Sequence, residues 1–212
     1  MRNVMISAAL VLAASAAVAT AAVPDADGWQ IGPVIRGKNY SVGMPSIPTD
    51  ARQGWYFDFP YPSPSAGHVH ALTFNHGPLT GKSRIVMRYR IDAERGVRIM
   101  PREAPGNPAT ITMFFQRRGD SWNAKGRYEA YRWYAPTVVD ITPGVHEVSV
   151  SFRDNWAAVM NSTARTNPVG FREAIDDADR VGFVLGARVG GAGHGVFATG
   201  PARMTVLSFQ VL

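Results

Sequence analysis

The 212-residue sequence contains no cysteine. Without disulfide bonds, the stability of the chain rests on a hydrophobic core. The absence also excludes a cysteine nucleophile and the lipidated cysteine that anchors bacterial lipoproteins. The G-x-S-x-G, H-E-x-x-H and P-loop motifs are missing too. The sequence therefore offers no common motif for covalent, zinc-dependent or nucleotide chemistry.

Long hydrophobic runs are also scarce. One apolar, alanine-rich run follows Arg2 near the N-terminus, and it is too short for a membrane span of about 20 strongly apolar residues. Two small-x-small triplets come next, as at a signal peptidase site. We predict a signal peptide over residues 1–22, cleaved after Ala19 or Ala21. The mature chain, 23–212, would be periplasmic or secreted and have no membrane span.

Lysine is the third scarce feature, with three lysines against nineteen arginines. The net charge is +6, and it becomes +5 when the signal peptide removes Arg2. Such an excess favours an anionic partner. For an exported protein, an acidic glycan or an envelope lipid fits better than nucleic acid. Codon bias and solubility are the alternative explanation for the same excess.

What the sequence does contain is a series of short alternating segments between turns rich in glycine and proline. The clearest covers residues 83–92, where Tyr89 and its alternate neighbours should face the core, while Arg84, Arg88 and Arg90 face outward. Carboxylates on neighbouring strands, or an anionic ligand, would relieve repulsion within this arginine stripe. Other strands are expected at 29–35, 54–60, 68–75, 97–100, 110–118, 127–134, 138–141, 145–153, 179–187 and 203–212.

One helix is predicted near residues 168–178, with Asn167 as its cap and Pro168 in its first position. Many short strands at intervals of 8–12 residues predict an all-β fold. We expect a single domain over 23–212, built as a two-sheet antiparallel β-sandwich, with a jelly roll as the favoured topology and a barrel as the alternative.

The stretch over residues 114–134, FFQRRGDSWNAKGRYEAYRWY, is rich in aromatics and arginines. We interpret it as two strands joined by a polar turn that carries Trp122. Aromatic rings stack on the C–H faces of sugars, and Arg or Asp side chains bind hydroxyls and carboxylates. Alternation places Tyr131 and Trp133 on one face of the second strand and Tyr128 and Tyr134 on the other. Either pair can be the core pair.

Two other patterns are weaker. His68-x-His70 has the spacing that begins a cupin metal site, but no glutamate occurs in residues 71–93, so we predict no metal site there. The glycines of GAGHGVFA, 191–198, match the dinucleotide fingerprint formally. That fingerprint requires a βαβ unit, which the predicted strands do not provide. We therefore expect no nucleotide cofactor.

A family resemblance rests on the order of several short motifs. These are GDSW (119–122), YRWY (131–134), NW (155–156), Phe171 in the helix, VGFVLG (181–186), GHGV (193–196) and the terminal TVLSFQV (205–211). Over residues 80–212 the chain resembles exported bacterial galactose-binding-like jelly-roll domains, which are similar to non-catalytic carbohydrate-binding modules. The resemblance implies a ligand site on loops or on a concave sheet face. It also implies that a structural calcium is allowed, although no acidic cluster in the sequence locates one.

The leading hypothesis is a non-catalytic protein that binds a polysaccharide or oligosaccharide, preferably an acidic one. The predicted ligand-binding residues are Arg88, Arg118, Asp120, Trp122, Tyr131, Arg132, Trp133 and Trp156. The four aromatics would stack on sugars, the arginines would bind carboxylates, and the aspartate would bind hydroxyls.

Two alternatives remain open. One is an envelope structural or adhesion protein without a small ligand. The other is a jelly-roll polysaccharide lyase, which needs a group that neutralises the uronate and a group that handles the proton. Arg88 would neutralise, and His70 or Tyr131 would handle the proton.

Overall fold

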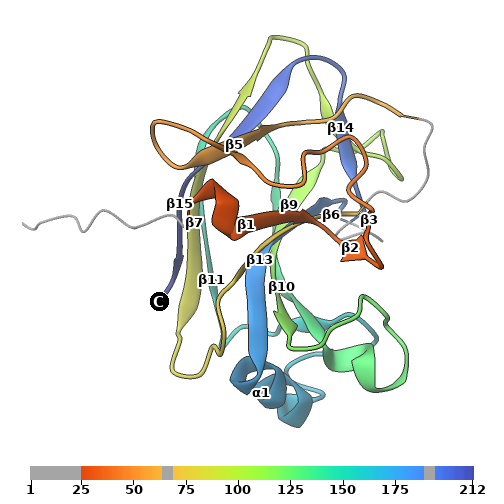
Figure 1. The fold of residues 1–212 in the computed structure, drawn as a ribbon, viewed down its shortest axis with the longest axis vertical. Helices are drawn as coiled ribbons and strands as arrows, with labels where there is room; N and C mark the ends of the chain where they lie inside the picture. The colour runs from red at the N-terminus through yellow and green to blue at the C-terminus, as the bar shows by residue number, and fades with distance from the viewer. Residues whose placement is uncertain (1–24, 64–68, 189–193) are drawn as a thin grey trace, which may run out of the picture.

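The computed structural model describes residues 25–63, 69–188 and 194–212, so the predicted signal peptide lies outside the described residues. Two antiparallel sheets pack face to face (Figure 1). The six-stranded sheet contains, in spatial order, β1 (Trp29–Gly32), β6 (His70–Asn75), β13 (Ala178–Gly186), β9 (Thr110–Arg117), β10 (Arg132–Asp140) and β12 (Ala157–Ala158). The five-stranded sheet contains β11 (Gly144–Ser151), β7 (Arg84–Ala93), β15 (Ala202–Val211), β5 (Trp55–Asp58) and β4 (Thr49–Asp50).

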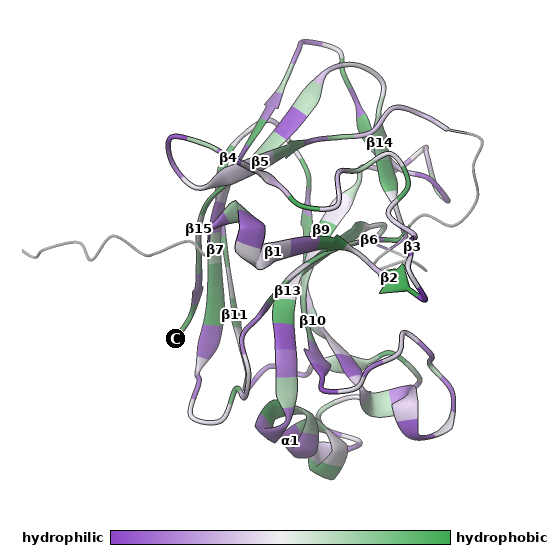
Figure 2. Ribbon diagram, in the orientation of Figure 1, coloured by the Kyte–Doolittle hydropathy of each residue, from purple (hydrophilic) through white to green (hydrophobic). Residues whose placement is uncertain are grey.

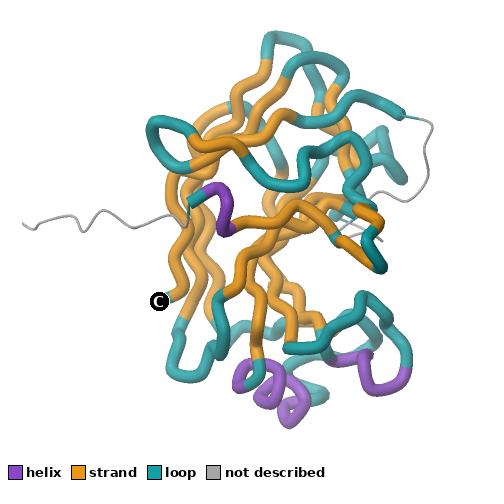
Figure 3. The backbone as a smooth tube through the Cα atoms, viewed as in Figure 1, coloured by secondary structure: helices purple, strands orange, loops and turns teal. Residues whose placement is uncertain are grey.

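Two small two-stranded ribbons and three helical elements complete the described elements (Figure 3). The ribbons pair β2 (Val34–Ile35) with β3 (Lys38–Asn39), and β8 (Ile99–Pro101) with β14 (Val196–Ala198). The helical elements are α1 (Pro168–Asp176) and the short 3-10 turns η1 (Ala26–Gly28) and η2 (Gly126–Ala130). The chain crosses between the two sheets from β5 to β6 and again from β6 to β7. This architecture confirms the predicted two-sheet antiparallel sandwich.

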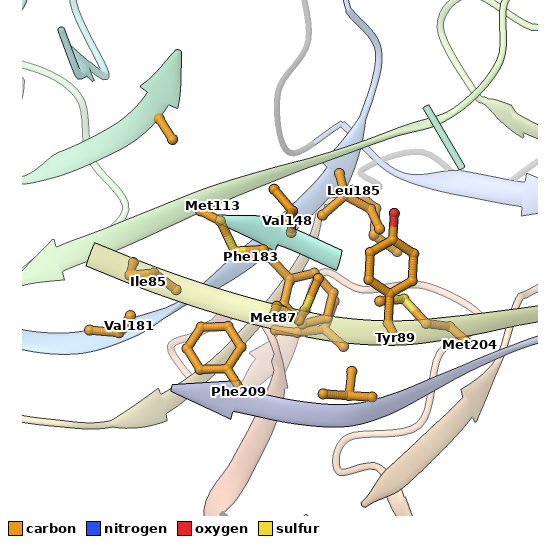
Figure 4. Packing of buried hydrophobic residues seen from close by; sticks show 14 of the residues in the cluster. Ile85, Met87, Tyr89, Met113, Val148, Val181, Phe183, Leu185, Met204 and Phe209 are labelled. Carbon is orange, nitrogen blue, oxygen red and sulfur yellow. The ribbon is translucent and has the colours of Figure 1, made fainter. Parts of the chain in front are cut away.

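The core lies between the sheets and follows the alternation seen in the sequence. On β7, Ile85, Met87 and Tyr89 are buried while Arg84 and Arg88 are exposed, as predicted. Burial of each large apolar side chain contributes about 1.5–3 kcal/mol. Figure 4 shows Met87 and Tyr89 packed among side chains from β13 and β15, including Phe183 and Phe209.

The helix matches its prediction closely. The side chain of Asn167 accepts a hydrogen bond from the Gly170 N–H at 3.0 Å, and Pro168 occupies the first helical position. Both features stabilise a helix start, because the first N–H groups have no partner within the helix. The structure ends α1 at Asp176, and β13 begins two residues later.

The strand predicted over 127–134 is wrong in its first half. The chain instead forms η2 over Gly126–Ala130, and β10 begins only at Arg132. Gly126 has a φ of 58°, a left-handed conformation that turns the chain and that glycine adopts at little cost. β10 then absorbs the separately predicted strand at 138–141. Its pairing with β9 is irregular around Pro136, which has no N–H to donate to a ladder.

The outer face of the six-stranded sheet is covered over part of its area. Ala71, Phe114 and Val184 are at most 1 % exposed and form a second, small hydrophobic cluster outside the main core. Trp122 and Tyr134 pack against this cluster. Its cover comes partly from the segment that joins β9 to β10, which folds back over the sheet (Figure 1). One sheet of the sandwich is therefore buried on both faces for part of its area.

Candidate ligand-binding groove

A groove with a volume of about 1080 Å³ lies over the outer face of the six-stranded sheet. Its floor is formed by β1, β6, β13 and β9. Its sides are the β2–β3 hairpin and the segment 117–123, which lie on either side in Figure 1. In Figure 2, β2 is hydrophobic and the turn after it is hydrophilic. A volume of this size accommodates a ligand of several sugar rings.

Polar and charged side chains dominate the lining. The cations are Arg36, Lys38, Arg117 and Arg180, the carboxylates are Asp120 and Asp179, and the neutral polar or aromatic residues are Gln30, Tyr40, Thr73, Gln116, Ser121, Trp122 and Asn123. Four cations against two carboxylates give the groove a positive balance.

The cations differ in their partners. Arg117 forms ion pairs with Glu173 at 3.2 Å and Asp177 at 3.1 Å. Arg180 donates a hydrogen bond to the side-chain oxygen of Gln30, a neutral partner. Within the described residues, Arg36, Lys38 and Arg180 have no carboxylate within 4 Å. These three side chains are available to an anionic ligand.

A buried ion pair lies at the base of the groove. The side chains of Asp120 and Arg132 are only 2 % and 5 % exposed. Arg132 donates from Nη1 to both carboxylate oxygens, at 2.9 and 3.0 Å, and Gln116 donates from Nε2 to Asp120 at 2.8 Å. Charge-assisted hydrogen bonds of this kind are about twice as strong as neutral ones. The pair forms part of the framework of the groove.

Trp122 is the predicted aromatic platform that the structure places in the groove. Its ring is half-buried and lies 4.9 Å from the guanidinium of Arg132 and 6.3 Å from the ring of Phe114. The backbone of Trp122 has a φ of 63°, which is rare for a bulky residue. Its N–H donates to Asp120 at 3.0 Å, and its carbonyl accepts from Arg132 at 3.3 Å. The side chains of Asp120 and Arg132 thus hold the backbone of the loop at Trp122.

Trp133 and Trp156 are not platforms, which corrects the prediction. Both are 0 % exposed and belong to the main core. Their Nε1 groups donate to the backbone carbonyls of Ala130 and Ser151, each at 2.8 Å. Both rings also pack near Phe171 of α1. Each indole is therefore buried and hydrogen-bonded inside the fold, and neither reaches a ligand.

Tyr131 lies between η2 and β10 and does not line the groove. Its ring is 5.0 Å from that of Tyr128 and 5.1 Å from the guanidinium of Arg117. Arg127 lies 4.9 Å above the Tyr128 ring, and its hydrogen bond lowers the pKa of Tyr128. The arginines and tyrosines of this stretch thus stack on each other near the groove.

The two remaining predicted arginines lie elsewhere. Arg118 is exposed, sits 3.7 Å from Asp177 and does not line the groove. Arg88 belongs to β7, on the outer face of the other sheet, opposite Glu147 in register. Arg88 therefore does not share a binding surface with the 114–134 stretch, because the two belong to different sheets.

The residues proposed for a lyase are not brought together. His70 is buried, and its Nδ1 accepts from the N–H of Val196 at 3.1 Å. Arg88 lies on the opposite sheet, and Tyr131 packs against Arg117. His68 lies outside the described residues. In the described part of the chain, no group of three or more His, Cys, Asp or Glu side chains could hold a metal ion, and no helix is long and apolar enough to cross a membrane.

Sequence reasoning missed the residues that the floor and the hairpin contribute, Gln30, Lys38, Tyr40, Thr73 and Arg180. They lie far apart in the chain and meet only because β1, β6 and β13 are neighbours. One local signal was available. Gln30 lies between the buried Trp29 and Ile31, so alternation places its side chain on the opposite face.

No family model matches the chain, and no curated protein matches it. One similar solved structure is a carbohydrate-binding module specific for non-crystalline cellulose, with 11 % identity, a TM-score of 0.48, and coverage of 92 % of this chain and 93 % of that one. Another is a mutant xylanase from Cellvibrio japonicus in complex with xylopentaose, with 14 % identity, a TM-score of 0.39 and coverage of 87 % of this chain. This chain spans about a quarter of the xylanase, 28 % of its length. The two antiparallel sheets agree with the sandwich that the sequence predicted.

Proposed function

We propose that the protein is a non-catalytic carbohydrate-binding protein and that its groove binds a chain containing acidic sugars. The observation that carries the proposal is the position of Trp122, half-buried in the groove, on the same surface as three cations without a carboxylate partner. An aromatic face binds the C–H face of a sugar ring, and arginine binds carboxylates through two parallel hydrogen bonds.

The rest of the lining suits the hydroxyl groups of a sugar chain. Gln30, Thr73 and Asn123 offer amide and hydroxyl groups, and Tyr40 adds a half-buried ring. Lys38 lies 5.0 Å from the centre of that ring. Polar side chains along a groove that also holds two aromatic rings favour an extended polar ligand over an apolar one.

The preference for acidic sugars follows from the charge balance. A neutral glycan would accept only hydrogen bonds from Arg36, Lys38 and Arg180, whereas a uronate would also supply the missing carboxylate. Because these side chains are exposed or half-exposed, their attraction for a charged polymer should weaken as salt screens it, with a Debye length of about 8 Å at physiological ionic strength.

Affinity electrophoresis through gels containing alginate, pectin or a neutral glucan tests the proposal. We expect retardation in at least one acidic gel, reduced retardation at high salt, and a loss of about tenfold in affinity for Trp122→Ala, which corresponds to a stacking contribution of about 1.4 kcal/mol. Tyr61→Ala is a matched control, because Tyr61 is 60 % exposed and does not line the groove.

Unretarded migration in every gel would contradict the proposal, and so would equal retardation of Trp122→Ala and wild type. Retardation only in the neutral gel would keep carbohydrate binding but reject the acidic preference. A chain that binds no glycan but captures a protein partner would instead fit the structural or adhesion alternative.

The proposed location follows from the N-terminal sequence. Export through a cleaved signal peptide would place the groove where polysaccharides occur. N-terminal sequencing of the protein recovered from periplasm or medium should begin at Thr20 or Ala22. Recovery of a chain that still begins at Met1 from the cytoplasm would contradict export.

A further inference from the structure

We propose that Asp120 and Arg132 are positioning residues, which hold the Trp122 ring at the groove and do not contact the ligand themselves. The inference rests on the proposed function, because it assigns the ligand contact to Trp122. It also changes the role that the sequence suggested for the pair, in which Arg132 bound carboxylates and Asp120 bound hydroxyls.

The backbone of Trp122 adopts a conformation that a bulky residue rarely takes. A φ of 63° is a left-handed conformation, in which the Cβ atom of an L-residue lies close to the backbone. Glycine is the usual residue at such a position. Strained conformations of this kind persist only where surrounding contacts over-determine them, and they concentrate at ligand sites. The conformation of Trp122 therefore depends on contacts from other residues.

The buried Asp120–Arg132 pair contacts Trp122 at both its N–H and its carbonyl. Asp120 accepts the N–H of Trp122 at 3.0 Å, and Arg132 donates to its carbonyl at 3.3 Å. The guanidinium of Arg132 also lies 4.9 Å from the centre of the indole. The ion pair thus fixes the backbone of Trp122 and packs against its side chain. Because Arg132 belongs to β10, it ties the loop to the sheet.

The carboxylate of Asp120 is already engaged by four hydrogen bonds. Asp120 Oδ1 accepts from Trp122 and Arg132, and Oδ2 accepts from Gln116 and Arg132. The two side chains are 2 % and 5 % exposed, so a ligand in the groove reaches neither charge. Direct ligand binding would require the loop to open and a buried charge to lose its partner.

The protein carries a built-in reporter for this arrangement. The sequence has five tryptophans, and Trp29, Trp55, Trp133 and Trp156 are each at most 1 % exposed. Trp122 is half-buried and lines the groove. Collisional quenching of the intrinsic fluorescence by acrylamide should therefore report on Trp122, and Trp122→Phe is the control that should remove most of it.

A mutant cycle tests the proposal. The double variant Asp120→Ala, Arg132→Met removes both buried charges together, a change that folded proteins often tolerate. We expect it to increase acrylamide quenching of Trp122 and to weaken retardation by an acidic polysaccharide about as much as Trp122→Ala does. Adding the same two substitutions to Trp122→Ala should change the affinity less than twofold, because the pair acts only through the indole.

A further loss of tenfold or more in the Trp122→Ala background would overturn the proposal, since it would mean that the pair binds the ligand directly. Unchanged quenching in the double variant would overturn it too. If Trp122→Ala itself does not affect retardation, the proposed function fails, while the quenching experiment still decides whether the pair positions the ring.

Arg132→Lys is the second variant, and it covers the case in which the double variant does not fold, as judged by its circular dichroism spectrum. Lysine keeps the positive charge and the ion pair but loses the planar fork and the packing on the indole. We expect increased Trp122 quenching and weaker retardation with an unchanged fold. Wild-type quenching and retardation in folded Arg132→Lys would contradict a positioning role.

Discussion

The outer faces of the two sheets differ in how many of their arginines have a carboxylate partner. On the five-stranded sheet the charges are mostly matched: Arg203 lies 2.7 Å from Asp58, Arg90 lies 2.7 Å from Asp92, and Arg88 faces Glu147 across the ladder. On the six-stranded sheet, Arg117 pairs with Glu173 and Asp177, but Arg180 donates to the neutral amide of Gln30 and has no carboxylate partner among the described residues. The Asp120–Arg132 ion pair at the base of the groove is buried. Arginine content alone therefore does not locate a binding surface. A binding surface for anions is indicated where arginines have no carboxylate partner in the protein.

Shape separates the two faces as strongly as charge. β7 alternates between buried residues and residues that are exposed or half-buried, as a strand with one solvent face should. β9 is buried at seven of its eight positions, because the segment after it folds back over the sheet and leaves a groove beside the β2–β3 hairpin. The segment that covers part of the six-stranded sheet forms the side of a groove that can bind a ligand. The outer face of the five-stranded sheet is open, and most of its arginines already lie beside or opposite carboxylates.

The largest expected effect is a difference in stability between variants of a core tryptophan, Trp133, and of the groove tryptophan, Trp122. Trp133→Ala should destabilise the fold by about 3–5 kcal/mol, because it removes a fully buried indole and leaves a cavity. Trp122→Ala should cost much less, since its ring is half-buried and its backbone is strained. Urea denaturation measures both. Equal losses would mean that Trp122 is a core residue and would remove the distinction on which the site depends.

The second prediction compares one arginine from each outer face. Arg180→Ala should weaken binding of an acidic polysaccharide about tenfold, the loss expected for one charge-assisted contact of about 1.4 kcal/mol. Arg88→Ala is the matched control and should change affinity less than twofold, because Arg88 lies on the other sheet. Affinity electrophoresis at fixed ionic strength compares them. A larger effect for Arg88 would move the site to the five-stranded sheet.

A smaller effect concerns Tyr89, on the buried face of β7. The Tyr89 hydroxyl is buried without a hydrogen-bond partner among the described residues, so Tyr89→Phe should stabilise the fold by about 1 kcal/mol at neutral pH. Burial raises the pKa of Tyr89 to about 12 from 10.0. Wild-type stability should therefore fall as pH rises from 10 towards 12, because only the unfolded chain ionises readily there.

Tyr89→Phe should flatten that alkaline decline. Urea denaturation between pH 8 and pH 11 measures the difference between the two proteins. An equally steep decline in the variant would assign the alkaline sensitivity to other groups, and a loss of stability at neutral pH would mean that the hydroxyl has a partner.

The smallest effect concerns the exposed ion pair of the open face. Arg203 lies 3.7 Å from the centre of the Tyr56 ring and bonds Asp58 through two hydrogen bonds, yet its side chain is 43 % exposed. Arg203→Ala should cost only about 0.2–1 kcal/mol, as exposed pairs do. High salt should reduce the difference. A loss above 2 kcal/mol would show that the open face contributes to stability far more than its exposure implies.

The sequence predicted the sandwich, the helix and most strands, because these depend on local alternation and capping. Asn167 and Pro168 mark the helix start, and Tyr89 marks the inner face of β7. The same reasoning failed at η2, where the chain departs from a ladder at Gly126. Composition alone did not reveal that the arginine-rich stretch would leave the sheet and cover it.

The site was predicted only in part, since local patterns do not specify the order of strands in a sheet. Trp122 was identified because an aromatic in a polar turn is hard to bury. Trp156, also outside a predicted strand, lies in the core, so position in a loop is not sufficient. Gln30 and Arg180 are 150 residues apart and meet through the neighbours of β6, a relation that no local motif encodes.

The most direct test of the account is acrylamide quenching of the wild-type protein with and without the acidic polysaccharide that retards it most. If the ligand occupies the groove, it should cover Trp122, reduce the quenching to the level of Trp122→Phe, and leave the four core tryptophans unaffected. Retardation of the protein by the polysaccharide with unchanged quenching would place the ligand elsewhere and contradict the assignment of the groove.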